Sequence, residues 1–219
     1  KNYHLSTNYK MFYDRIEAGK LLAAKLQKFR DEDGVVLAIP RGGVPVACEV
    51  ARELNWPVEI ILTKKIGHPT NNEYAIGVAS LNDYFISPLH RVSGLYVQTE
   101  VALVQKRLNS MYKKFMGSKK PISLRGKTVI IVDDGVATGN TLFGTVSVLQ
   151  KSKPGKIIIA VPVGPKDTMA ELSKKVDEVV VLKIPKMFHA VGYYYEDFEQ
   201  VSDEEVMFYL NRSEEAKKV

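Results

Sequence analysis

The sequence has little cysteine, because Cys48 is the only one among 219 residues. One cysteine excludes an intrachain disulfide and a zinc site built from several thiolates. No apolar stretch approaches the ~20 residues that a membrane-spanning helix needs. The first residues also lack the basic segment and apolar core of a secretory signal. We therefore expect a reducing, cytoplasmic location and no contact with a membrane.

The sequence also lacks clustered charge, although its formal net charge is +6. The basic residues are scattered and form only short pairs, such as Lys64-Lys65, Lys119-Lys120 and Lys174-Lys175. No run of interleaved basic and aromatic residues is present, and short charged pairs usually lie on a solvated surface. Nucleic acid is therefore not the expected partner, and the charge favours either a small anionic ligand or no specific ligand.

Apolar residues make up 45% of the chain, which is typical of a globular protein, and the length suits one domain spanning residues 1–219. Short runs rich in β-branched residues predict strands that are buried on both faces, as in a parallel sheet. Those runs are 35–39, 58–62, 128–132, 157–161 and 179–182.

Helical patterns lie between the predicted strands. The clearest has apolar residues three and four apart over residues 97–115, with lysine and arginine on the opposite face. Other helices are expected over 12–29 and after Gly43, Asn140 and Asp167. Thr168 with Glu171, and Ser202 with Glu205, have the spacing of a capping box.

Strands that alternate with helices predict an α/β fold of the Rossmann-like, doubly wound type. It would have a mainly parallel five-stranded sheet flanked by helices. Ligands of such folds bind at the carboxyl ends of the strands. The segment 67–95 is long and polar for a simple connection, so we expect a flexible lid there.

The third predicted strand is followed by two acids, Asp133 and Asp134, and then by small residues up to Thr141. A small-residue turn that opens a helix directs backbone N–H groups toward a phosphate, and the helix dipole adds partial positive charge. The turn lacks the lysine of a nucleotide-binding P-loop, which predicts a phosphate that is held rather than transferred. The carboxylates can accept hydrogen bonds from sugar hydroxyls, so a ribose 5-phosphate would suit both features. The alternative is an ordinary strand end and turn.

The run from Val129 to Thr141 resembles the phosphoribosyl pyrophosphate motif of the type I phosphoribosyltransferases. The shared pattern is four apolar residues, two acids, two variable positions, a small residue and Thr-Gly-x-Thr. The resemblance implies that Asp133 and Asp134 bind the ribose hydroxyls. It assigns the 5-phosphate to the loop residues, which are Ala137, Thr138, Gly139, Asn140 and Thr141. Gly135 departs from the family pattern, in which an apolar residue is usual.

Two further loops extend this resemblance. Arg41 and Gly42 follow the first strand and are similar to the family's diphosphate loop, in which glycine allows close approach and arginine pairs with phosphate oxygens. Lys64 and Lys65 are interpreted as the end of the second strand, where they would neutralise the leaving diphosphate. Solvated lysines are the alternative. The segment 67–95 resembles the flexible catalytic loop, with Glu73 as its first candidate residue.

The segment 183–200 resembles the hood with which 6-oxopurine members of the family cover the base. By that resemblance Phe188 and Val191 would bind the base, and Asp197 would contact the metal. A hydrophobic edge that closes the core is an equal alternative. Mg²⁺ is the expected cofactor, held largely by substrate oxygens and water, with Asp133 and Asp134 contributing, in part through water.

The resemblance implies transfer of a 5-phosphoribosyl group from phosphoribosyl pyrophosphate to a purine-like or other nitrogenous base. Ala137 stands where 6-oxopurine members carry an acid, so the identity of the base is left open. A homodimer is expected, as in similar proteins. The main alternative is a regulator that senses phosphoribosyl pyrophosphate and binds nucleic acid without turnover. A nucleotide hydrolase is a third hypothesis, disfavoured by the missing P-loop lysine.

Overall fold

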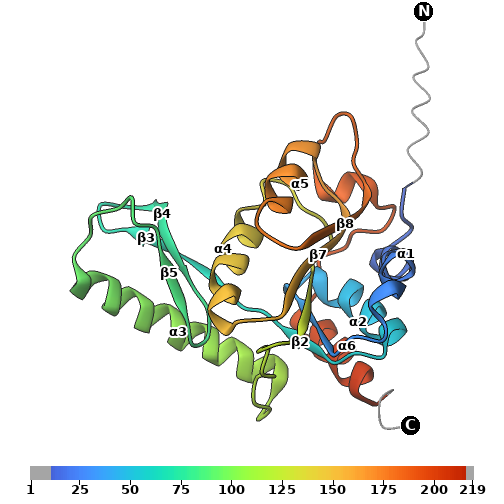
Figure 1. Ribbon diagram of the computed structural model, residues 1–219, viewed down its shortest axis with the longest axis horizontal. Helices are drawn as coiled ribbons and strands as arrows, with labels where there is room; N and C mark the ends of the chain where they lie inside the picture. The colour runs from blue at the N-terminus through green and yellow to red at the C-terminus, as the bar shows by residue number, and fades with distance from the viewer. Residues whose placement is uncertain (1–10, 216–219) are drawn as a thin grey trace, which may run out of the picture.

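The structure is a computed structural model that describes residues 11–215. Its main sheet has five parallel strands in the order β2-β1-β6-β7-β8, which confirms the predicted fold class (Figure 1). The strands are β1 (Gly34–Ala38), β2 (Val58–Ile60), β6 (Thr128–Val132), β7 (Lys156–Val163) and β8 (Glu178–Lys183). Each predicted apolar run therefore forms a strand, with ends that differ by at most two residues.

The central strands β1 and β6 are buried along their whole length. They pair in parallel, with Gly34 opposite Thr128 and Ala38 opposite Val132. Because both strands end at the same level, the loops that follow them begin side by side at the carboxyl edge of the sheet. This pairing fixes where the candidate site forms.

Helices cover both faces of the main sheet. One face packs against α1 (Arg15–Leu26), α2 (Gly43–Leu54) and α6 (Asp203–Glu215), through buried residues such as Leu22, Val50 and Val206. The other face packs against α4 (Asn140–Leu149) and α5 (Lys166–Ser173), through Leu142 and Leu172. Alternate residues of each strand enter these two clusters, which explains the continuous apolar runs in the sequence.

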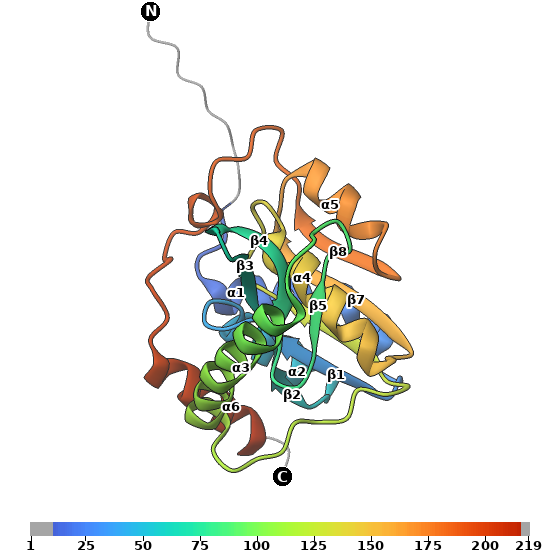
Figure 2. The ribbon, with the colours of Figure 1, turned by 90° about the vertical axis from the view of Figure 1, so that its left-hand side faces the viewer.

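The segment after β2 forms a separate antiparallel sheet with the order β3-β4-β5. Its strands are β3 (Lys64–His68), β4 (Asn71–Ala79) and β5 (Tyr84–Ile86). Together with α3 (Gly94–Met116) they project from the main body as an arm (Figures 1 and 2). The segment 67–95, predicted to be a flexible lid, therefore contains most of this sheet, and its role as a lid stays a prediction. Only a few residues of these strands are buried, among them Ile66, Ile76 and Val78, so no continuous apolar run marked them.

The hood segment 183–200 lies against the start of the described chain. The backbone N–H of Phe12 donates to Tyr194 O at 2.9 Å, and Glu196 and Asp197 donate back to Phe12 O and Tyr13 O at 2.9 and 2.8 Å. Phe12, Tyr194 and Tyr195 also share a small hydrophobic cluster. The hood and the residues before α1 consequently form one packed unit, although they lie at opposite ends of the sequence.

Of the two predicted capping boxes, the one at Ser202 is present and the one at Thr168 is absent. Ser202 N–H donates to Glu205 Oε2 at 2.8 Å, and Glu205 N–H donates to Ser202 Oγ at 3.1 Å, so the capping box of α6 is confirmed. Thr168 makes no such box, because α5 begins earlier, at Lys166, and the Thr168 hydroxyl donates to Ala137 O at 2.9 Å. Within the described chain, no helix has both the length and the apolar character that crossing a bilayer requires.

Ser202→Ala removes the hydroxyl that accepts the Glu205 N–H at the start of α6. We expect it to lower the free energy of unfolding by about 0.5–2 kcal/mol, the usual cost of losing such a cap. Urea denaturation followed by circular dichroism measures this change. Ser110→Ala is the matched control, because Ser110 is exposed within α3 and alanine is the better helix former. Equal stability losses in the two variants would contradict the prediction.

Candidate active site

The loop between β6 and α4 forms an anion cradle. Gly139, with a φ of 75°, is the residue before α4, and Ala137, Thr138, Asn140 and Thr141 are exposed around it. The first N–H groups of a helix lack carbonyl partners within that helix, and the helix dipole gives them partial positive charge. Backbone donors are therefore gathered where the sequence predicted a phosphate site.

Three neighbouring elements fix the cradle. Val136 N–H donates to Val163 O at 2.9 Å, and the Thr168 hydroxyl binds Ala137 O from α5. From the hood, the Tyr195 hydroxyl donates to Asp134 O at 2.5 Å. The loop is thus held from β7, α5 and the hood at once, which reduces the reorganisation needed when an anion binds.

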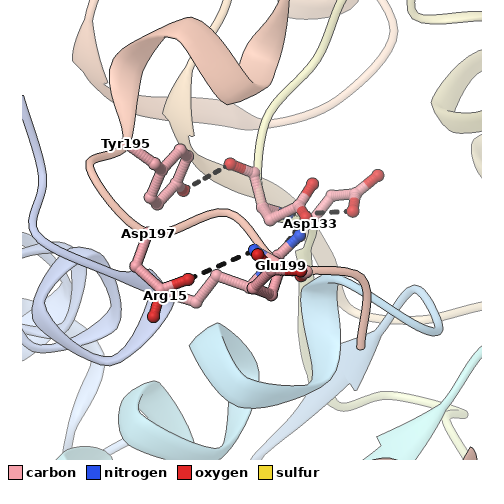
Figure 3. Close-up of polar contacts among 6 residues, drawn as sticks. Arg15, Asp133, Tyr195, Asp197 and Glu199 are labelled. Carbon is pink, nitrogen blue, oxygen red and sulfur yellow. Dashed lines mark hydrogen bonds and ion pairs between the residues drawn. The ribbon is translucent and has the colours of Figure 1, made fainter. Parts of the chain in front are cut away.

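The two acids contact each other and Arg15, the first residue of α1; Figure 3 shows Asp133 and Arg15 in this group of contacts. Asp134 N–H donates to Asp133 Oδ1 at 2.9 Å, and Arg15 Nε donates to Asp134 Oδ2 at 2.9 Å. Burial, followed by repulsion from Asp134, raises the pKa of Asp133. Burial also raises the pKa of Asp134, and the Arg15 guanidinium offsets part of that rise. The positive charge near the two carboxylates therefore does not fully compensate their negative charge. Hydroxyl donors or a cation bound beside them would stabilise their charged forms.

The loop after β1 touches these acids. A Cβ atom added to Gly42 would lie 2.0 Å from Asp134 Oδ2, so only glycine allows the two loops to approach this closely. The peptide bond between Pro40 and Arg41 in this loop is cis.

Arg41 is held by an acid from α6. Its Nε forms an ion pair with Asp203 Oδ1 at 2.8 Å. Lys114 and Arg41 together lower the pKa of Asp203, the hydrogen bond from Lys114 having the larger effect.

A cavity of about 730 Å³ joins these loops. Its polar lining comes from segments that are distant in sequence, namely Arg15, Arg41, Gly42, Lys64, Asp134 and Thr141. Residues of α3, including Leu108 and Phe115, form an apolar wall. A second cavity of about 660 Å³ lies between the arm and α4, and Lys64 and Thr141 line both cavities.

The predicted position of Lys64 and Lys65 needs correction. The strand β2 ends at Ile60, and the two lysines begin β3, because the chain leaves the main sheet to form the arm. Lys65 Nζ pairs with Glu73 Oε2 at 2.7 Å, and that pairing lowers the pKa of Glu73. Of the two cavities, Lys65 and Glu73 line only the second, whereas Lys64 also lines the first, together with Asp134.

The hood residues pack mainly against protein. Phe188 stacks on Tyr194 with 5.7 Å between ring centroids, and Val191 covers Gly135. Asp197 Oδ1 accepts the Glu199 N–H at 3.2 Å (Figure 3). Among the described residues, those lining the 730 Å³ and 660 Å³ cavities include none of Phe188, Val191 and Asp197. The contacts of Phe188 and Val191 with a base, and of Asp197 with a metal, stay predictions. The packing contacts seen here fit the alternative, which is a hydrophobic edge that closes the core.

Sequence reasoning missed Arg15, Tyr195 and Asp203. Arg15 and Tyr195 bind Asp134, and Asp203 binds Arg41, so each acts on a predicted site residue. Arg15 and Asp203 begin helices α1 and α6, so the rule that ligands gather in the loops after the parallel strands could not find them. Tyr195 does follow the parallel strand β8, and the repeated tyrosines at 193–195 were a signal that could have marked it.

The described residues contain no group of three or more acids, histidines or cysteines arranged to hold a metal ion. Asp133 and Asp134 do offer adjacent oxygen donors of the kind that Mg²⁺ prefers. Burial raises the pKa of both carboxyls, and repulsion from Asp134 adds to the rise at Asp133, so a cation beside them would be stabilised. The residues fit a magnesium ion that takes most of its ligands from substrate and water.

The five-stranded parallel sheet with helices on both faces is the fold that the resemblance to phosphoribosyltransferases implied. A family model described as the phosphoribosyl transferase domain matches residues 8–199, so the chain belongs to the phosphoribosyl transferase family. Two Mycobacterium tuberculosis proteins, named provisionally as phosphoribosyl transferases, are 38% identical over 213 residues. The match covers 93% of this chain and 47% of theirs, so the chain spans about half the length of these curated relatives.

A solved structure from Thermus thermophilus has the same architecture. It superposes with a TM-score of 0.84 at 36% identity, covering 92% of this chain and 98% of that chain.

Gly42→Ala should displace the Asp134 carboxylate, because the added methyl group would lie 2.0 Å from Asp134 Oδ2. We expect binding of phosphoribosyl pyrophosphate with Mg²⁺ to weaken by about tenfold or more, equivalent to about 1.4 kcal/mol. Isothermal titration calorimetry measures the affinity. Gly94→Ala is the control, because nothing lies within 4 Å of a Cβ added at Gly94. Unchanged affinity in Gly42→Ala would show that the contact between these loops is irrelevant to binding.

Proposed function

We propose that this protein transfers the 5-phosphoribosyl group of phosphoribosyl pyrophosphate to a nitrogenous base and releases diphosphate. The observation that supports this proposal most strongly is the 730 Å³ cavity that these loops line together. It is lined by the cations Arg41 and Lys64, the acid Asp134 and the cradle residue Thr141. Separate groups for diphosphate, sugar and phosphate around one cavity are what a phosphorylated, activated pentose requires.

In the proposed reaction a nitrogen atom of the base attacks the anomeric carbon. The bond from that carbon to the diphosphate oxygen breaks, a carbon–nitrogen bond forms, and the base loses a proton. The barrier arises from separating the positive charge on the sugar from the negative charge on the diphosphate. Asp133 and Asp134 would hold the ribose hydroxyls and favour the cationic sugar. Arg41 and Lys64 would stabilise the diphosphate charge.

Magnesium is the proposed cofactor. Asp133 and Asp134 would hold it, directly or through water, and it would supply positive charge to the diphosphate as that group leaves. The cradle residues Ala137 to Thr141 would keep the 5-phosphate fixed by backbone N–H groups. Holding both ends of the sugar restricts the anomeric carbon to the geometry that the attack needs.

The base remains open within this proposal. Ala137 has no ionisable group to handle a base proton, and Phe188 and Val191 are proposed to contact the base from the hood. A cytoplasmic homodimer also stays a proposal, and analytical ultracentrifugation tests the dimer directly. A panel of purines, xanthine-like bases, pyrimidines and simple amines, with Mg²⁺ and diphosphate release as the readout, identifies the acceptor.

The same panel distinguishes the competing functions. Diphosphate release that requires one class of acceptor supports the transferase. Cleavage of nucleoside phosphates without any acceptor would indicate a hydrolase. Tight binding to nucleic acid that falls steeply with salt, with no turnover of any base, would indicate the regulator.

Asp134→Asn removes the negative charge proposed to hold the ribose and favour the cationic sugar. We expect kcat/KM for phosphoribosyl pyrophosphate to fall on the order of 100-fold, the size of effect seen when one such electrostatic group is removed. Asp31→Asn changes an exposed acid in a turn and serves as the control. Circular dichroism checks that both variants stay folded. If Asp134→Asn releases diphosphate at the parent rate, the sugar-site assignment is wrong.

A further inference from the structure

Arg15 is a cation that the proposed reaction has not yet used. It is the first residue of α1, and Asp14 caps that helix by accepting the Glu17 N–H at 2.7 Å. This cap sets the direction in which the chain enters the helix, so that Arg15 faces the acid pair. Arg15 lines the 730 Å³ cavity together with Arg41 and Lys64.

The Arg15 side chain is held on several sides. Nε donates to Asp134 Oδ2 at 2.9 Å, and Nη1 donates to Glu199 O at 2.8 Å. The guanidinium carbon lies 3.9 Å from the centre of the Phe198 ring, so the plane of the cation also has an aromatic partner. Only 11% of the side chain is exposed. A guanidinium has five N–H donors, and these two contacts leave donors on the same plane for a ligand in the cavity.

The other two cations of the cavity are less fixed. Arg41 is 45% exposed and forms an ion pair with Asp203, while Lys64 is exposed at the start of the arm. Ordering an exposed, flexible side chain on binding costs conformational entropy, whereas Arg15 is already ordered. A planar guanidinium also matches two phosphate oxygens at once.

The position of Arg15 beside Asp134 resolves an electrostatic conflict. The proposed substrate carries a diphosphate, and the same cavity contains a buried carboxylate that would repel it. A cation that contacts the carboxylate on one edge can face the anion with another edge. Arg15 contacts the Asp134 carboxylate through Nε, and it also lines the cavity in which the anion would bind.

We infer that Arg15 is a further substrate-binding residue, which binds the diphosphate group through the guanidinium N–H donors not directed at Asp134 and Glu199. This inference rests on the proposed function, because it assigns a residue to the leaving group of that reaction. It places one diphosphate-binding residue outside the loops after the parallel strands, at the start of α1.

The test compares three ligands by isothermal titration calorimetry with Mg²⁺: phosphoribosyl pyrophosphate, inorganic diphosphate and ribose 5-phosphate. In Arg15→Gln, we expect the affinity for the two diphosphate-containing ligands to fall by about tenfold to a hundredfold, typical of losing a charged hydrogen bond. The affinity for ribose 5-phosphate should change by less than about threefold. Arg15→Lys keeps the charge without the planar fork, so it should bind diphosphate with intermediate affinity.

Arg30→Gln is the matched control, because Arg30 is an exposed arginine just beyond the same helix, and its affinities should equal those of the parent. Thermal unfolding checks the fold, and if Arg15→Gln does not fold, Arg15→Lys carries the same comparison with a smaller expected loss. Equal weakening of all three ligands would mean that Arg15 only positions Asp134, and unchanged affinities would also overturn the inference. If the parent protein binds no phosphoribosyl pyrophosphate, the proposed function itself fails, which is a separate result.

Discussion

The in-register pairing of β1 with β6 is the constraint on which the rest of the site depends. Because Ala38 lies opposite Val132, the loops that begin after these strands emerge at one level and touch through Gly42 and Asp134. A shift of register by one residue would reverse the faces of a strand and separate the two loops. The continuous apolar runs that bury both strands therefore also determine the spacing between the anion cradle and Arg41.

The contact between these loops places Asp134 in a costly environment. Burial of a carboxylate is unfavourable unless it is paired or hydrogen-bonded, and the neighbouring Asp133 adds repulsion. Arg15 compensates in part, through a pairing in which both side chains are largely buried. A structure selected only for stability would gain from removing one of the two acids. Their retention is consistent with a site whose charge is completed by a bound substrate and cation.

The sequence was sufficient to predict the main sheet and the loops after β1 and β6. Continuous apolar runs mark strands buried on both faces, and small residues before a helix mark an anion cradle. The arm was not predictable in the same way, because β3 and β4 begin with exposed lysine, asparagine and glutamate and bury only a few residues near their other ends. Arg15 and Asp203 were not predictable either, since their partners Asp134 and Arg41 lie more than 100 residues away and only the folded chain brings them together.

The elements at the two ends of the described chain complete the site. Arg15 comes from α1 and binds Asp134, whereas Asp203 comes from α6 and binds Arg41. The hood adds Tyr195, which binds the Asp134 carbonyl and pairs with the segment before α1. The parallel sheet therefore supplies the loops, and the first and last helices fix the orientation of the charged side chains on them. A change that separates α1 from the hood would disturb the charge around Asp134 without altering any residue of the cradle itself.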